Sequence, residues 1–313
     1  MADSHVEGGT KAIVAAFVAN LGIAIAKLIG FVFTSSSAML AESVHSFADT
    51  GNQALLLFGG RSASREASFQ HPFGYGRERY FWAFVVSVVL FTLGSVFAIY
   101  EGIEKLRHPH ELESPEWAIG ILIVALLLEG GSLRTAINAA NPLRNGASWW
   151  SYIRNSKAPE LPVVLLEDTG AMLGLVIALV AISLAHVTGE ARWDGGGTVA
   201  IGVLLGFIAA VVASEMRSLL IGEAASDEDS ESIIDAIQTA PHVERLIHIK
   251  TQHLGPEELL VAAKVAFPPD LSVRELATAI DELEICIRDR VPYARAIYIE
   301  PDIECDCAGT LGS

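Results

Sequence analysis

Six apolar segments, each about 20 residues or longer, most constrain what this chain can fold into. At about 1.5 Å of rise per residue, a helix of that length spans the ~30 Å hydrocarbon core of a bilayer. The 313-residue chain is 51% hydrophobic and has a mean hydropathy of +0.43, which is too apolar for a soluble domain of this size. The sequence therefore predicts an all-α, six-helix transmembrane bundle. The predicted spans cover residues 11–33, 38–60, 80–100, 115–137, 161–187 and 195–220.

Basic residues are unevenly distributed over the loops between these segments. The second and fourth loops, together with Arg134 at the end of the fourth segment, carry eight Lys or Arg residues, against three in the alternate loops. Because short cytoplasmic loops are enriched in Lys and Arg, the second and fourth loops are expected to be cytoplasmic. An even number of spans returns the chain to its starting side. We therefore expect a multi-pass integral membrane protein in the lipid bilayer, with N- and C-termini cytoplasmic.

The last third of the chain is acidic and water-soluble in character. From Gly222 onward the chain has 19 Asp and Glu residues but only 7 Lys and Arg residues, a net charge of −12. Its pattern predicts helix, strand, strand, helix, strand, with a capping box at Ser272 and Glu275. We expect a transport domain at 1–221, a cytoplasmic α+β domain (αββαβ, ferredoxin-like) at 222–304 and a tail at 305–313. No basic patch offers the charge that nucleic-acid binding requires, so no nucleic acid is expected as a partner.

Ionisable residues inside the apolar segments point to function. His45 and Asp49 lie four positions apart, which places an imidazole and a carboxylate on one helix face. Each such group costs about 2.5–3.5 kcal/mol within hydrocarbon, so it rarely occurs there without a role. A nitrogen and an oxygen donor at this spacing can bind one divalent cation. The alternative is a buried His–Asp hydrogen bond that only packs helices together.

Two other apolar segments supply further carboxylates. Glu167 and Asp168 lie in segment five and Glu129 lies in segment four. Because adjacent helical residues are about 100° apart, only one of Glu167 and Asp168 is expected to bind the metal directly. The other is then a candidate to support the ligands from outside.

These features resemble the cation diffusion facilitator family. The resemblance is carried by six spans, the serine turn at 35–37, ESVHSFAD at 42–49, HPFGYG at 71–76 and the αββαβ domain. It implies a homodimeric exporter of divalent metal, usually zinc, driven by proton exchange. His45, Asp49 and Asp168 match the metal-binding positions of the family.

Two positions depart from the family pattern. Val164 stands where the family has the first ligand of segment five, so Glu167, Glu129 or a water is needed to complete the site. His71 matches a further metal position in the second loop, but Tyr75 replaces a second histidine there. The alternative for His71 is an ordinary turn leading into segment three.

The sequence thus predicts a secondary transporter that exchanges a divalent metal, most readily Zn²⁺, for protons at mid-membrane depth. The transported cation is the cargo, and no prosthetic group and no enzyme activity are expected. The expected partners are a second copy of the chain, the bilayer, metal ions and protons. The alternatives are a non-transporting metal-sensing or scaffolding homologue, or a transporter specific for Mn²⁺, Fe²⁺ or Co²⁺.

Overall fold

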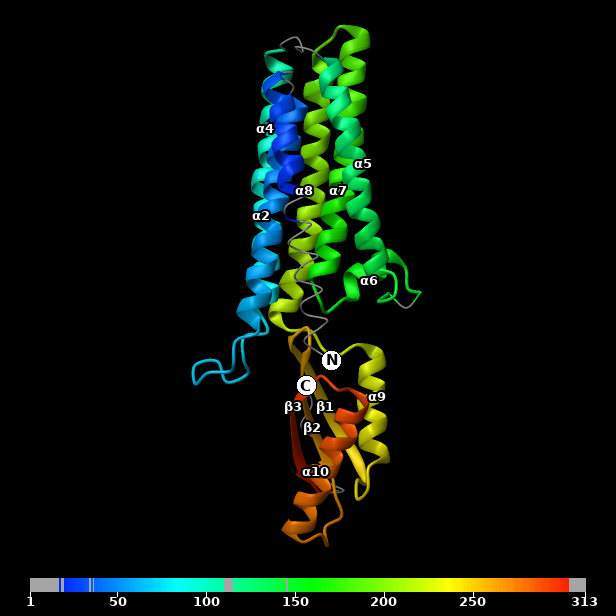
Figure 1. The fold of residues 1–313 in the computed structure, drawn as a ribbon. Coiled ribbons are helices and arrows are strands. Elements are labelled where there is room, and N and C mark those ends of the chain that lie inside the picture. The colour runs from blue at the N-terminus through cyan, green and yellow to red at the C-terminus, as the bar shows by residue number, and fades with distance from the viewer. Residues whose placement is uncertain are drawn as a thin grey trace. The chain divides into compact units, whose positions relative to one another are not determined.

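Figure 1 shows a computed structural model of the chain. It describes residues 17, 20–33, 35, 37–109, 115–144 and 146–303. Two compact units divide the chain, Met1–Ser64 with Glu78–Arg217, and Arg65–Arg77 with Ser218–Ser313. The predicted tail at 305–313, with Cys305 and Cys307, lies outside the described residues.

The first unit is made of helices. Its first described helix is Asn20–Phe33, which has no label in Figure 1. The helices that follow are α2 (Ser37–Ala63), α3 (Glu78–Val89), the π-helix η1 (Leu90–Val96), α4 (Phe97–Arg107), α5 (Pro115–Ala140), α6 (Trp149–Asn155), α7 (Glu160–Thr188) and α8 (Arg192–Ile221). Because α3, η1 and α4 follow one another without a break, they form one helix of 30 residues.

Four helices within the described residues are long and apolar enough to span a membrane: Glu78–Arg107, Pro115–Ala140, Glu160–Thr188 and Arg192–Ile221. They match four of the six predicted spans. Asn20–Phe33 is a shorter apolar helix, and α2 has 27 residues but carries His45 and Asp49. The mainly helical membrane fold is therefore confirmed, and the count of six spans remains a prediction.

Glycines let the continuous helix Glu78–Arg107 pack so closely on α8 that their backbones are in contact. A Cβ atom built on Gly102 would lie 2.8 Å from the Gly195 carbonyl oxygen, and one on Gly202 would lie 3.0 Å from that of Ser95. No side chain fits in either place, so the two backbones touch. Small residues at such crossings are typical of helix packing in membranes, where close van der Waals contact stabilises association.

The second unit contains a small mixed sheet covered by two helices. Its elements are α9 (Asp227–Thr239), β1 (Arg245–Gly255), β2 (Glu258–Ala266), α10 (Val273–Arg290) and β3 (Ala294–Asp302). This order is the αββαβ order predicted from the sequence. The strands lie in the order β1-β2-β3, with β1 and β2 antiparallel and β2 and β3 parallel.

Local sequence signals fix the two helices of this unit. The Ser226 side chain caps α9, and Ser272 with Glu275 forms the capping box expected for α10. Ile233, Ile237, Leu283 and Ile287 are fully buried against the sheet. Each helix therefore begins at its polar cap and packs its apolar stripe on the strands.

The loop that follows α2 belongs to the second unit and packs on the β1–β2 hairpin. A Cβ on Gly76 would lie 2.8 Å from the Leu254 carbonyl oxygen, and one on Gly255 would lie 2.9 Å from the Gly76 Cα. The two glycines therefore allow a direct backbone contact. Within the loop, the Ser68 and Tyr75 hydroxyl groups lie 3.0 Å apart in a hydrogen bond.

We expect Gly76→Ala to detach this loop from the hairpin. The new methyl group must displace the Leu254 carbonyl, and overpacking of this kind costs about 1–3 kcal/mol. Because each 1.4 kcal/mol is a factor of ten, tryptic cleavage after Arg65 and Arg77 should become about tenfold faster. Phe69→Ala is the control, since Phe69 is fully exposed in the same loop. Equal cleavage rates in Gly76→Ala and the wild type would contradict the contact.

Candidate metal site in the membrane helices

One side of α2 is polar although it is buried. Its buried polar residues are Ser43, His45, Ser46, Asp49, Thr50, Asn52 and Gln53. They recur every three or four positions and so form stripes along the helix. Five of them have a buried nitrogen or oxygen atom without a hydrogen-bond partner in the described part of the chain, namely Ser43, His45, Asp49, Asn52 and Gln53. Each such atom costs about 1–3 kcal/mol unless water or a ligand binds it. The stripe is therefore suited to binding a polar ligand or an ion.

The predicted pair on α2 comes together in the structure. The His45 Nε2 and Asp49 Oδ2 atoms are 3.4 Å apart, one helical turn from each other. His45 is fully buried, and neither of its ring nitrogens makes a hydrogen bond to another described residue. The pair thus offers unused nitrogen and oxygen donors on one helix face, as a divalent cation requires.

The two acidic residues of α7 face different neighbours. The Asn52 side-chain amide donates a hydrogen bond of 2.8 Å to Glu167 Oε1, which links α7 to α2. The Ser132 hydroxyl donates one of 3.0 Å to Asp168 Oδ2, which links α7 to α5. The roughly 100° between adjacent helical residues accounts for this divergence. Glu167 is therefore the α7 carboxylate that reaches the helix carrying His45 and Asp49.

Glu129 of α5 contacts a buried lysine. The Lys27 ammonium, on the helix Asn20–Phe33, lies 3.7 Å from Glu129 Oε1 and donates a hydrogen bond of 2.7 Å to the Ser46 hydroxyl of α2. Both charged side chains are buried. A buried ion pair is tolerated in a low-dielectric interior only when its charged groups have polar partners. The Lys27 ammonium has such partners on two helices, Ser46 of α2 and Glu129 of α5.

Charged groups from three other helices lie around Asp49. They are Glu167 and Asp168 of α7, Glu129 of α5 and Lys27 of the helix Asn20–Phe33. Among the residues that the structure describes, however, no three His, Cys, Asp or Glu side chains lie close enough together to hold a metal ion. Glu167 and Asp168 are bound instead to Asn52 and Ser132. Metal binding at this site therefore requires carboxylates to exchange these hydrogen bonds for the cation.

Val164 lies in an apolar environment. It packs at the edge of a cluster formed by Ala136, Ala140, Tyr152 and Leu165, from α5, α6 and α7. This setting explains why a valine is accommodated at the position where the family has a ligand. The four-residue spacing to Asp168 does not by itself direct position 164 to the metal.

We therefore expect Val164→His to add no ligand. The imidazole would be buried in the apolar cluster at a cost of about 1–3 kcal/mol, so thermal stability should fall and zinc affinity should not rise. Thermal unfolding and isothermal titration of the purified protein measure the two effects. Val164→Ile is the control and should behave like the wild type. A tenfold gain in zinc affinity for Val164→His would show that this position faces the site.

His71 lies in the loop of the second unit. Its ring packs at a tilt of 35° against the Tyr75 ring with a centroid distance of 4.6 Å, and its backbone closes a turn with Ser68. The Arg65 guanidinium lies over the Tyr75 ring, 4.3 Å from its centre. The ring of His71 therefore has an aromatic neighbour and a nearby cation, and its role in metal binding remains a hypothesis.

Sequence reasoning did not identify two residues that organise this region, Asn52 and Ser132, or the partners of Lys27. The position of Asn52, three residues after Asp49 on the same helix face, was a usable signal. Ser132, three residues after Glu129, carried a similar signal. Lys27 lies within the first apolar segment of the sequence, but its partners Ser46 and Glu129 depend on helix packing that periodicity does not reveal.

Comparison with known proteins identifies the family. Residues 13–221 match the family model described as the cation efflux transmembrane domain. Residues 225–302 match the model described as the cation efflux protein cytoplasmic domain. The chain therefore belongs to the cation efflux family, in agreement with the resemblance to the cation diffusion facilitators, and it is a multi-pass membrane protein.

Several curated proteins are similar to this chain. The human protein named proton-coupled zinc antiporter SLC30A9, mitochondrial, is 31% identical over 263 residues, which cover 83% of this chain and 46% of that protein. Metal tolerance protein C4 of Arabidopsis thaliana is 32% identical and covers 78% and 54%. Cation-efflux pump FieF of Pectobacterium atrosepticum is 24% identical and covers 92% and 91%. The chain thus spans about half the length of the first two relatives.

Proposed function

We propose that this chain is a secondary active transporter that exports a divalent metal, most readily Zn²⁺, in exchange for protons. One observation carries the proposal: both ring nitrogens of His45 and the Oδ1 atom of Asp49 are buried without a hydrogen-bond partner among the described residues, and the α7 carboxylate of Glu167 reaches the same helix through Asn52. Burying these groups is costly, and a divalent cation offsets the cost by coordinating them. The relatives named as a zinc antiporter and a cation-efflux pump support the same activity.

The metal-binding residues we propose are His45, Asp49 and Asp168. We further propose Glu167 as the fourth ligand in place of the residue missing at Val164, which differs from the single α7 ligand expected from the sequence and requires both α7 carboxylates to leave Asn52 and Ser132 for the cation. Glu167 is favoured because it already contacts α2 through Asn52. Glu129 is bound to Lys27 and is assigned a supporting role. A site with one imidazole and three carboxylates suits zinc, and excludes manganese, iron and cobalt less than a site with two imidazoles.

Proton exchange follows from the chemistry of these ligands. A metal requires a neutral His45 and ionised carboxylates, so binding releases protons and release of the metal takes them up. Opening of a mid-membrane site to alternate faces then couples the two fluxes. We further propose that the chain acts as a homodimer with both termini in the cytoplasm, and that the described part of the second unit forms the cytoplasmic domain.

Metal-stimulated proton flux in proteoliposomes tests the function. Purified full-length protein is reconstituted, and zinc uptake and internal pH are followed together, with manganese, iron and cobalt compared. We expect zinc to give the largest flux and to move protons in the opposite direction. A protein that binds zinc in titrations and moves none would instead be a metal-sensing homologue, the main alternative.

A further inference from the structure

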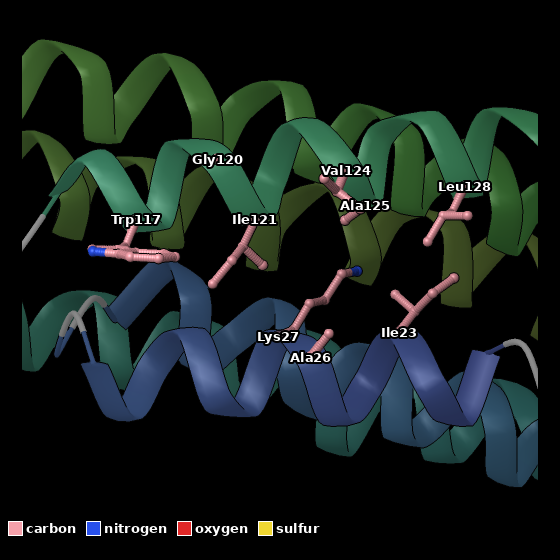
Figure 2. A pocket seen from close by; sticks show the side chains of 9 residues that line it. All are labelled: Ile23, Ala26, Lys27, Trp117, Gly120, Ile121, Val124, Ala125 and Leu128. Carbon is pink, nitrogen blue, oxygen red and sulfur yellow. The ribbon is translucent and has the colours of Figure 1, made fainter.

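Lys27 reaches the centre of the bundle from its edge. Its aliphatic chain lines an apolar groove of about 280 Å³ between the helix Asn20–Phe33 and α5, and Figure 2 shows it extending toward α5 beside Ala125. Its ammonium is fully buried and reaches Ser46 and Glu129. The side chain thus keeps its apolar stem in the groove and directs its charge to the inside.

The Lys27 ammonium contacts the helix that carries His45 and Asp49, two of the proposed ligands. It acts electrostatically on both Asp49 and His45. Its hydrogen-bond partner, Ser46, is the residue that follows His45 on α2. Of the described residues, Lys27 and Lys105 are the buried basic side chains, and only Lys27 acts on this pair. The region therefore holds one fixed positive charge among four buried carboxylates.

We propose that Lys27 is a tethered cation that balances the carboxylates of the site and weakens its hold on a divalent metal, so that the metal can leave. The inference rests on the proposed function. An ammonium and a metal ion are attracted by the same carboxylates and repel each other in a low-dielectric interior. Glu129 anchors the ammonium, and Ser46 holds it beside α2. Lys27 is thus a positioning residue that sets the balance between binding and release.

The test compares four variants of the full-length protein, in detergent for zinc affinity and in proteoliposomes for zinc flux. Lys27→Met should bind zinc about tenfold more tightly, because one repulsive charge is removed. Its KM and its kcat for zinc should both fall, since a tighter site releases metal more slowly. Lys27→Arg keeps the charge and should restore values near those of the wild type.

Glu129 provides the complementary change. Glu129→Gln leaves the ammonium without its anion and should weaken zinc binding about tenfold. The double variant Lys27→Met with Glu129→Gln removes both charges, leaves the net charge unchanged and should bind within about threefold of the wild type. This variant also tests the inference if Lys27→Met alone does not fold, because replacement of a buried ion pair by uncharged residues is well tolerated.

The measured zinc affinities decide whether Lys27 has the proposed role. Wild-type affinity in Lys27→Met, or a tenfold loss in the double variant, overturns the role of Lys27 and leaves the proposed transport in place. Equal effects of Lys27→Arg and Lys27→Met show that shape rather than charge is important, and also overturn it. A wild-type protein that neither binds nor moves zinc removes the proposed function, and this inference with it.

Discussion

Asp49→Asn is expected to abolish zinc transport while leaving a folded protein. Loss of a residue that only supports a metal ligand lowers affinity by about 10–100-fold, so loss of a direct ligand should lower it by at least ~100-fold. The amide keeps the size of the side chain but lacks the negative charge, and Asp49 Oδ1 has no hydrogen-bond partner within the described ranges to lose. Isothermal titration and zinc flux in proteoliposomes measure the effect.

Thr50→Val is the matched control for this prediction. Thr50 is the next residue on α2 and is also buried, but its hydroxyl donates to the Ser46 carbonyl of its own helix. Valine has nearly the same shape, so zinc affinity and flux should stay within a few-fold of the wild type. Zinc flux at the wild-type rate in Asp49→Asn would remove Asp49 from the proposed site.

The second large effect is expected at Glu167. Glu167→Gln should reduce zinc affinity by about 100-fold, as should Asp168→Asn, if α7 contributes both carboxylates to the site. Asn52→Ala removes only the amide that holds Glu167 and should cost about tenfold. Larger losses of zinc affinity in Glu167→Gln and Asp168→Asn than in Asn52→Ala would distinguish the two ligands from the residue that orients one of them.

Glu160→Gln is the control on the same helix. Glu160 begins α7 and forms an ion pair with Arg79, with both side chains partly exposed. Exposed ion pairs contribute at most about 1 kcal/mol, so its loss should not change zinc binding. If Glu167→Gln binds zinc like the wild type while Asp168→Asn does not, Asp168 is the α7 ligand and Glu167 only packs against α2.

Much of the fold could be predicted because it depends on local patterns. Apolar length located the helices, and the capping box at Ser272 and Glu275 marked the start of α10. Alternation in the acidic third of the chain predicted the strands in their correct order. The π-helix at Leu90–Val96 could not be predicted, because its sequence is as apolar as the helices on either side and its geometry depends on packing.

The candidate site was predictable only in part. The spacing of His45 and Asp49 on one helix sufficed to place them together, since that contact is one turn long. The partners of Glu167, Asp168 and Glu129 lie on other helices, and helix rotation decides which neighbours they meet. Sequence periodicity predicts which residues share a helix face, but not which neighbouring helix packs against that face. The contacts of Asn52 and Ser132 were therefore missed.

The π-helix has a consequence for how this chain tolerates change in length. A π-turn holds an extra residue relative to an α-helix, and each helical residue turns the chain by about 100°. Deleting one residue within Leu90–Val96 can therefore restore a regular α-helix without changing the number of turns, so the residues that follow keep nearly the same rotational phase. Gly102 would then still face Gly195 of α8. The π-helix thus lets this helix hold one more residue without turning the α4 glycine away from α8.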